Sequence, residues 1–385
     1  MPSGPPAHRG GRCTTDTHWL TLGLAQGRCN QSLTPLLDAF GGPQGILRAH
    51  PAALRDAGLP PATVRALRDP DTAIMRRTES WLAEPGHCAV TWDDDCYPPL
   101  LREIPDPPVV LFLRGDPAVA SLPQLAVVGS RNATPGGSDI ARRFAARLGQ
   151  AGFCITSGLA RGIDAAAHTG ALGTGAPTVA VCGTGPDIVY PAAHRPLAAE
   201  IATNGAVLTE FPPGTGPRPA HFPRRNRLIS GLAVGVLVVE AGERSGALIT
   251  ARLAANQGRE VFAVPGSIRQ PLTRGCHRLL RQGATLVEDP GDIVTELGSL
   301  LAHCAQAVEQ NIPSRVDHKA KPIEPEAKRL LHRMGWEPVS VDDLVRWTGL
   351  TTAELCSMLV TLELAGRVVS LTGSRFQRRE EKAPI

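Results

Sequence analysis

The chain has 385 residues, a hydrophobic fraction of 42% and a net charge of +4, and its length predicts about two or three domains. So small a net charge excludes nucleic-acid binding by overall attraction, and any such binding must come from a local basic patch. The nine cysteines form no Cys-x-x-Cys pair, which excludes a zinc ribbon or a secreted disulfide framework and favours a reducing, cytoplasmic location. No apolar run approaches the roughly 20 residues of a membrane span.

The first part of the chain predicts a tail followed by a small helical domain. Residues 1–17 are rich in Pro, Gly and His and lack the apolar segment of a signal peptide, so we expect a disordered tail. Residues 18–83 predict short helices separated by Gly and Pro, over Thr34–Phe40, Ile46–Ala49, Ala52–Asp56 and Pro61–Arg68. This pattern resembles a SAM-like or helix-hairpin-helix module, and a domain that serves only for packing is the open alternative.

The central region, residues 86–300, alternates short apolar runs with helical patterns. Residues 86–120 form an entry segment of strand and turn. The apolar runs are Leu125–Val128, Cys154–Thr156, Thr178–Cys182, Ala206–Leu208, Val236–Val239 and Val261–Val264. This alternation predicts a doubly wound parallel sheet with helices on both faces. Because ligands bind at the carboxyl ends of such strands, the loops that follow should meet at one edge and form a phosphate site.

Two motifs carry the chemistry of that edge. Gly129-Ser130-Arg131 follows a strand, and its glycine, hydroxyl and guanidinium suit an oxyanion at a helix start. Further on, Phe222 stands beside Arg225 and Arg227, so a base could stack on the ring while the guanidinium groups meet phosphates. The alternative for this second motif is an arginine-rich helix start with solvated side chains.

Other motifs argue against enzymes that use a nucleotide cofactor. Gly183-Thr184-Gly185 lacks the third glycine of a dinucleotide fingerprint, and no Walker A sequence occurs. We therefore expect no cofactor and no metal. Asp164 and His168 suggest a hydrolase triad with Ser157, but no Gly-x-Ser-x-Gly elbow is present, and a cap with a local hydrogen bond is the favoured interpretation.

Glu240 follows an apolar strand and has two possible roles. Its carboxylate could orient a sugar hydroxyl or hold Arg227 in place, and the second role is favoured.

Residues 301–325 predict a linker, and residues 326–378 a winged-helix domain. Thr351-x-x-Glu354 is a capping box at the start of a helix over Thr352–Ala365 that Gly366 ends. Two strands, Arg367–Leu371 and Arg375–Gln377, would flank Gly373. Because the helix contains no Lys or Arg, we hypothesise that it does not read bases.

Several motifs in consistent order resemble the DNA-processing protein A (DprA/Smf) family. They are Val128-Gly129-Ser130-Arg131, Ser157-Gly158-Leu159-Ala160-Arg161-Gly162-Ile163-Asp164, Tyr190-Pro191, Phe222-Pro223-x-Arg225-Asn226-Arg227, Ser245-Gly246-x-Leu248-Ile249-Thr250, and Pro265-Gly266 with Gly275-Cys276-His277. The family resemblance implies an α/β fold, an extended Rossmann-like sheet flanked by a SAM-like and a winged-helix domain.

The resemblance also implies a function without catalysis. It implies a protein that binds single-stranded DNA, protects incoming DNA and loads RecA in natural transformation, and that forms a homodimer. The residues implied for DNA binding are Gly129, Ser130, Arg131, Ser157, Gly158, Arg161, Gly162, Gly183, Gly185, Phe222, Arg225, Asn226, Arg227, Ser245, Gly246 and Thr250. Those implied for the dimer or RecA surface are His277, Leu280 and Leu286.

The chain departs from the family pattern at one place, and two alternative functions remain open. Many relatives carry a lysine after the Tyr-Pro motif, where this chain has Ala192-Ala193-His194-Arg195, so Arg195 or Arg161 would have to supply that charge. A nucleotide-processing enzyme similar to phosphoribohydrolases is the first alternative, although their Pro-Gly-Gly-x-Gly-Thr loop is absent. A structural adaptor is the second.

Overall fold

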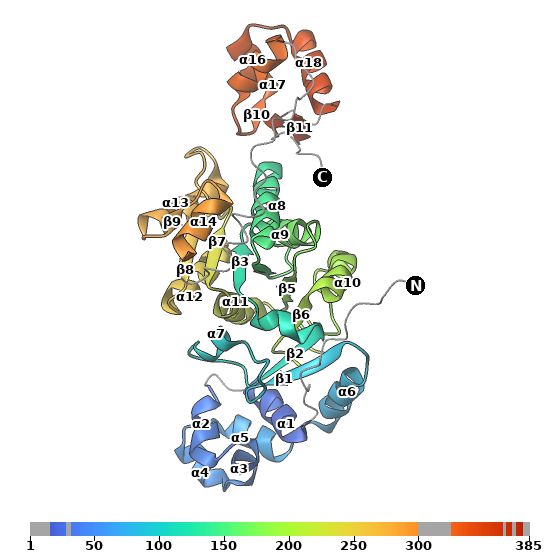
Figure 1. Ribbon diagram of the computed structural model, residues 1–385, viewed down its shortest axis with the longest axis vertical. Coiled ribbons are helices and arrows are strands. Elements are labelled where there is room, and N and C mark those ends of the chain that lie inside the picture. The colour runs from blue at the N-terminus through green and yellow to red at the C-terminus, as the bar shows by residue number, and fades with distance from the viewer. Residues whose placement is uncertain (1–15, 28–31, 299–324, 365–366, 372–374, 380–385) are drawn as a thin grey trace.

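The computed structural model describes residues 16–27, 32–298, 325–364, 367–371 and 375–379. They form three parts along the long axis of the molecule, with the N-terminal helices at one end, a large sheet in the middle and a winged helix at the other end (Figure 1). The predicted tail lies almost entirely outside the described residues, as do residues 301–324 of the predicted linker. No helix in the described ranges is long and apolar enough to cross a membrane.

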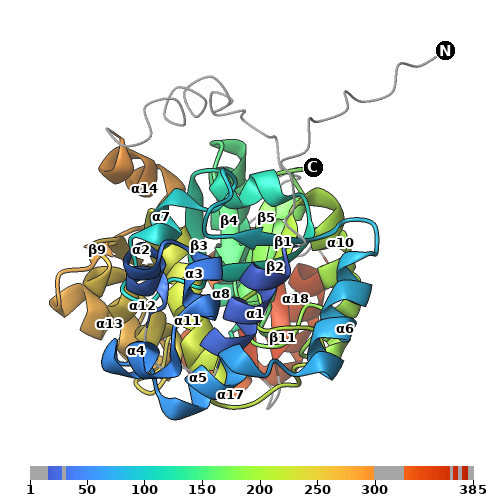
Figure 2. The same cartoon turned by 90° about the horizontal axis from the view of Figure 1, so that it is seen from below.

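Six helices form the N-terminal part: α1 (Thr17–Gln26), α2 (Thr34–Phe40), α3 (Pro43–Arg48), α4 (Pro51–Asp56), α5 (Pro61–Arg68) and α6 (Thr72–Leu82). Gly41 ends α2 with φ +70°, a left-handed conformation that glycine adopts without strain. Trp19, Leu22 and Trp81 are buried together with Phe112 of the sheet, so these helices pack on the edge of the sheet. Figure 2 views the molecule from this end.

A sheet of nine strands forms the middle part, in the order β1-β2-β6-β5-β4-β3-β7-β8-β9. The strands are β1 (His87–Thr91), β2 (Val110–Gly115), β3 (Gln124–Val128), β4 (Cys154–Ser157), β5 (Thr178–Val181), β6 (Ala206–Thr209), β7 (Gly235–Val238), β8 (Glu260–Ala263) and β9 (Thr285–Leu286). β1 and β2 pair antiparallel and β2 pairs antiparallel with β6, whereas all other pairs are parallel. The six predicted strands are confirmed, each to within one residue at either end.

Helices cover both faces of this sheet, as predicted. The elements that follow β1 are α7 (Pro99–Arg102), η1 (Pro117–Ser121), α8 (Pro135–Gln150), α9 (Ile163–Leu172), η2 (Ala192–His194), α10 (Arg195–Asn204), α11 (His221–Leu232), α12 (Ala247–Asn256), η3 (Pro271–Thr273), α13 (Arg274–Arg281) and α14 (Pro290–Leu297). Val236 and Val238 pack with α11, α12 and α13, while Leu237 packs with α8, α9 and α14. Successive side chains of a strand point to opposite faces, so both faces of β7 are buried.

The winged helix consists of α16 (Pro325–Met334), β10 (Val339–Ser340), α17 (Val341–Thr348), α18 (Thr352–Leu364), β11 (Val368–Leu371) and β12 (Arg375–Arg378). The predicted capping box is confirmed, because Glu354 accepts hydrogen bonds from the amide and hydroxyl of Thr351, at 2.9 and 2.7 Å. β11 and β12 pair antiparallel, as predicted for the wing, and Gly366 and Gly373 lie outside the described residues.

Candidate nucleic-acid interface

A pocket of about 480 Å³ lies at the carboxyl ends of β3, β4 and β7, where the sequence predicts a site. We call it the rim pocket. It brings together the following predicted residues: Gly129, Ser130, Arg131, Arg225, Asn226, Ser245, Gly246 and Thr250. It also contains Asn132 and Arg244, which the sequence analysis did not identify because each stands alone in a loop without a recognisable motif.

The loop after β3 is held close to its neighbours. A Cβ at Gly129 would lie 2.6 Å from the side chain of Ile163 and 2.8 Å from the main-chain oxygen of Glu240, so only glycine fits there. The amide of Ser130 donates to the same Glu240 oxygen at 2.7 Å. This anchoring leaves Arg131 exposed at the mouth of the pocket.

The exposed Arg131 and Tyr190 and the half-buried Phe222 form a group that we call the aromatic platform. The guanidinium carbon of Arg131 lies 5.5 Å from the centre of the Phe222 ring, and the Tyr190 ring lies 5.5 Å away on a tilt of 44°. Tyr190 is 48% exposed. A Cβ at Gly183 would lie 3.0 Å from Phe222, so Gly183 makes room for the ring. The sequence analysis quoted the Tyr190-Pro191 motif but did not name Tyr190 as a candidate for DNA binding.

Arg225 is buried and its donors face the protein's own main chain. Its Nη1 donates to the carbonyl oxygen of Gly158 at 2.7 Å and to that of Val181, and its Nε donates to Asn226 at 3.2 Å. Burial lowers the pKa of Arg225, and the nearby Asp164 carboxylate raises it. Arg225 therefore holds the ends of β4 and β5 in place. The sequence analysis predicted a contact with phosphate for Arg225 and did not predict this structural role.

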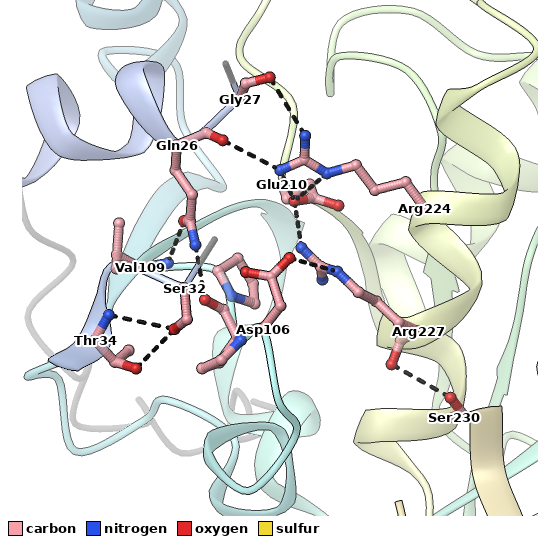
Figure 3. Close-up of polar contacts among 12 residues, drawn as sticks. Gln26, Gly27, Ser32, Thr34, Asp106, Val109, Glu210, Arg224, Arg227 and Ser230 are labelled. Carbon is pink, nitrogen blue, oxygen red and sulfur yellow. Dashed lines mark hydrogen bonds and ion pairs between the residues drawn. The ribbon is translucent and has the colours of Figure 1, made fainter. Parts of the chain in front are cut away.

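Arg227 lies outside the lining of the rim pocket and is paired with carboxylates (Figure 3). Its Nη2 donates to Glu210 at 2.7 Å, and its Nε lies 3.4 Å from Asp106. The prediction that Glu240 holds Arg227 is wrong, because Glu210 does so. These partners make a structural role a better account of Arg227 than a phosphate contact.

The same Glu210 oxygen binds a second guanidinium. Arg224 donates to it from Nε at 3.1 Å and from Nη2 at 2.9 Å. Arg224 also donates to the main-chain oxygen of Gly27 at 3.3 Å, just after α1, as Figure 3 shows. Glu210 and Arg224 thus join the N-terminal helices to the start of α11, the helix that carries Phe222.

Glu240 occupies the N-terminus of α8. Its two carboxylate oxygens accept from the amide and hydroxyl of Thr134, at 2.9 and 2.6 Å, and a Cβ at Gly137 would lie 2.3 Å from its carboxyl carbon. Burial raises the pKa of Glu240, against the effect of the Thr134 hydrogen bonds. The helix terminus that the sequence offered to a phosphate is therefore already bound to a carboxylate of this chain.

The groups of the rejected hydrolase triad have separate partners. Asp164 accepts from the amides of Gly158 and Ala160 at 3.1 and 3.3 Å, both in the loop before α9. The predicted cap and the predicted local hydrogen bond between Asp164 and His168 are both wrong, because the N-cap of α9 is Gly162, with no side-chain cap, and His168 has another partner. His168 bonds through Nδ1 to the hydroxyl of Thr178 at 2.7 Å. Ser157 donates to the main-chain oxygen of Val127 at 2.7 Å, so its hydroxyl is turned into the sheet.

The remaining predicted residues lie in three places. Arg161 is exposed and Gly162 half-buried in the loop after β4, where Gly162 has φ +74°. The amide of Gly185 donates to the Thr215 oxygen at 2.8 Å. In the proposed partner surface, His277 bonds to the Gly266 oxygen at 2.9 Å, Leu280 is half-buried and Leu286 is 49% exposed.

Among the described residues no group of three His, Cys, Asp or Glu could hold a metal.

Comparisons with known proteins agree with this architecture. The family model described as DNA recombination-mediator protein A matches residues 88–298, and that of the DprA winged helix domain matches 316–374. Protein Smf of Escherichia coli K12 is 42% identical over 300 residues, which cover 78% of this chain and 79% of that protein.

Two solved structures are also similar. The X-ray structure of DNA processing protein A from Streptococcus pneumoniae is 38% identical with a TM-score of 0.65 and covers 74% of this chain and 99% of that one. A Helicobacter pylori DNA processing protein A, whose structure is described in terms of its single-stranded DNA binding mode, is 27% identical with a TM-score of 0.51 and covers 55% of this chain and 96% of that one. With its Rossmann-like sheet and winged helix, the chain belongs to the DNA recombination-mediator protein A (DprA/Smf) family.

Proposed function

We propose that the protein binds single-stranded DNA along the rim pocket and the aromatic platform. The observation that carries the proposal is the exposed Arg131, which lines the rim pocket and lies over the half-buried Phe222 ring with Tyr190 beside it. Unpaired bases stack on such rings whatever their sequence, and guanidinium groups neutralise phosphates. Paired bases inside a duplex offer no free face to the rings, so single strands are the preferred ligand.

The charge around the rim supports the same ligand. Arg131, Arg161, Arg195 and Arg244 are all exposed, and none forms an ion pair with a carboxylate among the described residues. They provide the local basic patch that a chain of net charge +4 needs. His194 bonds to the main-chain oxygen of Leu159 at 2.9 Å, which brings the turn that carries Arg195 against the loop that carries Arg161, so either arginine can supply the charge of the lysine found in many relatives.

We propose further that binding occurs without catalysis. The carboxylate that a phosphoribohydrolase-like enzyme would need is Glu240, and both its oxygens accept hydrogen bonds from Thr134. Glu240 is also 7% exposed and is not among the residues that line the rim pocket. A role as a recombination mediator, which protects incoming DNA and loads RecA in natural transformation, fits a protein that binds strands and leaves them intact.

A homodimer and RecA are the protein partners that we propose. The proposed surface comprises His277, Leu280 and Leu286 on α13 and β9. Leu286 is 49% exposed, and Ile268 in the loop that follows β8 is 82% exposed. Large apolar side chains of this kind commonly mark protein contacts. Leu286→Glu should reduce the dimer mass measured by light scattering, while the same change at the exposed Val360 of α18 should not.

A titration of single-stranded and double-stranded oligonucleotides at two ionic strengths tests the proposal. Wild type should prefer the single strand, and its log affinity should fall linearly with log salt. Arg131→Ala should weaken binding and make the salt slope shallower by about 0.7 for each phosphate that the variant no longer neutralises. Arg147→Ala is the control, because Arg147 is exposed in the last turn of α8, away from the rim. Equal affinity of Arg131→Ala and wild type would refute the proposed site.

A further inference from the structure

A groove between α12 and α13 continues the rim pocket toward the outer edge of the sheet. It has a volume of about 880 Å³, and Arg244 and Ser245 line both hollows. Figure 1 shows α12 and α13 beside β8, in yellow and orange. The two hollows therefore adjoin at the loop between β7 and α12.

The groove is lined by more positive than negative side chains. Four arginines and two glutamates line it, and of the arginines only Arg259 is engaged, since it lies 2.9 Å from Glu103 and donates to the Leu100 oxygen at 2.8 Å. Arg244, Arg252 and Arg278 are exposed and have no carboxylate partner among the described residues. Three guanidinium groups thus face solvent along one hollow.

Helix geometry accounts for the shape of the groove. Leu248, Arg252 and Ala255 lie at i, i+4 and i+7 in α12 and so share one face. Small residues such as Ala251, Gly283 and Ala284 line the groove beside the larger Leu248 and Leu279, and its volume leaves room for an extended chain. None of the described residues that line the groove is aromatic, so it offers charge without a surface for stacking.

We propose that this groove carries the sugar–phosphate backbone of the same single strand as it leaves the rim pocket, an inference that rests on the proposed function. The partner must be anionic, because the unpaired charges are guanidinium groups, which bind phosphates well. The partner must also be long and continuous, because Arg244 faces both hollows. A polynucleotide meets both requirements, and its contact here is sensitive to salt and insensitive to sequence.

The test is a titration of the full chain with oligothymidylates of increasing length. For wild type, affinity should rise with length in two stages, first as the rim pocket is filled and then as the strand reaches the groove. Arg252→Glu should abolish the second stage, so that long strands bind about fivefold more weakly with a shallower salt slope, while short strands bind as to wild type. Arg147→Glu should reproduce both stages, because α8 packs on the opposite face of the sheet.

The outcomes distinguish a failure of this inference from a failure of the proposed function. If wild type binds no short strand, the proposed function fails. If short strands bind and Arg252→Glu matches wild type at every length, the groove carries no DNA, and an acidic protein segment becomes its better partner. Arg278→Gln should show the same loss as Arg252→Glu while keeping the fold and the light-scattering mass of wild type. Normal binding of long strands by that variant would also overturn the inference.

Discussion

Arg225 donates from Nη1 to the carbonyl oxygen of Gly158 at 2.7 Å, and this bond ties the start of α11 to the loop after β4. A Cβ at Gly158 would lie 2.6 Å from the same guanidinium. The guanidinium of Arg225 can therefore take this position only because residue 158 is a glycine. The two residues shape the rim from within, while Arg131 is exposed and lines the rim pocket.

Arg225→Ala should destabilise the protein by about 2–4 kcal/mol, because it leaves two buried carbonyl oxygens without their donor and the buried Asp164 carboxylate without its neighbouring positive charge. Arg225→Lys should not restore stability, since an ammonium group lacks the planar guanidinium whose Nη1 reaches both carbonyls while its Nε donates to Asn226. Urea unfolding measures both effects. If Arg225→Ala kept wild-type stability and lost only DNA affinity, Arg225 would be a phosphate ligand instead.

Glu210→Ala should cost about 3–5 kcal/mol, because it removes the carboxylate that binds both Arg224 and Arg227 and leaves the latter, with a side chain only 11% exposed, with Asp106 as its one remaining carboxylate among the described residues. Adding Arg227→Ala to Glu210→Ala should cost less than Arg227→Ala alone costs in wild type, since the two share one interaction. Glu200→Ala on the exposed side of α10 serves as the control, with a change within about 0.5 kcal/mol. Strictly additive losses would contradict this account.

The strands of the sheet could be predicted because they are local features of the sequence. The apolar run Val236–Val239, for example, becomes β7 over Gly235–Val238, and a run buried on both faces needs no partner to be recognised. The antiparallel pairing of β2 with β6 could not be predicted, because it joins residues almost 100 positions apart with no pattern in common.

The candidate site could be predicted only where a single loop contains all the residues that indicate it. Gly129-Ser130-Arg131 lies in the rim pocket as expected. In the Phe222–Arg227 motif, by contrast, three arginines within four positions have different surroundings, because Arg225 faces two strand ends and the other two face Glu210. Residues adjacent in a helix point in different directions, so their roles depend on the fold around them.

Tyr190→Ala should weaken single-strand binding by about 1–3 kcal/mol, the usual contribution of one stacked base. The salt slope should stay that of wild type, because no charge is removed. Fluorescence anisotropy with an oligothymidylate measures both quantities. An oligonucleotide of abasic sugars is the control ligand, and wild type and variant should bind it equally. A shallower slope for the variant would mean that Tyr190 acts by positioning Arg131.

His168 should make the protein less stable in acid. Thr178 donates its hydroxyl proton to the Ile155 oxygen at 2.6 Å, so its oxygen accepts from Nδ1 of a neutral His168 ring, and Nε2 has no partner. Burial lowers the pKa of His168 to about 3, whereas in the unfolded chain it is about 6.5. Below pH 6.5 the unfolded state therefore binds one more proton than the native state, and stability falls as the pH falls.

The expected loss from this group between pH 6.5 and pH 5 is about 2 kcal/mol. His168→Asn keeps a donor near the position of Nδ1 and cannot be protonated in this range. As the pH is lowered, the free energy of unfolding of the His168→Asn variant should therefore fall less steeply than that of wild type. The difference in stability that favours wild type at neutral pH should become smaller. Urea unfolding of both proteins across this range gives the difference directly. Parallel curves would mean that His168 is protonated in the native state, and hence that water reaches Nε2.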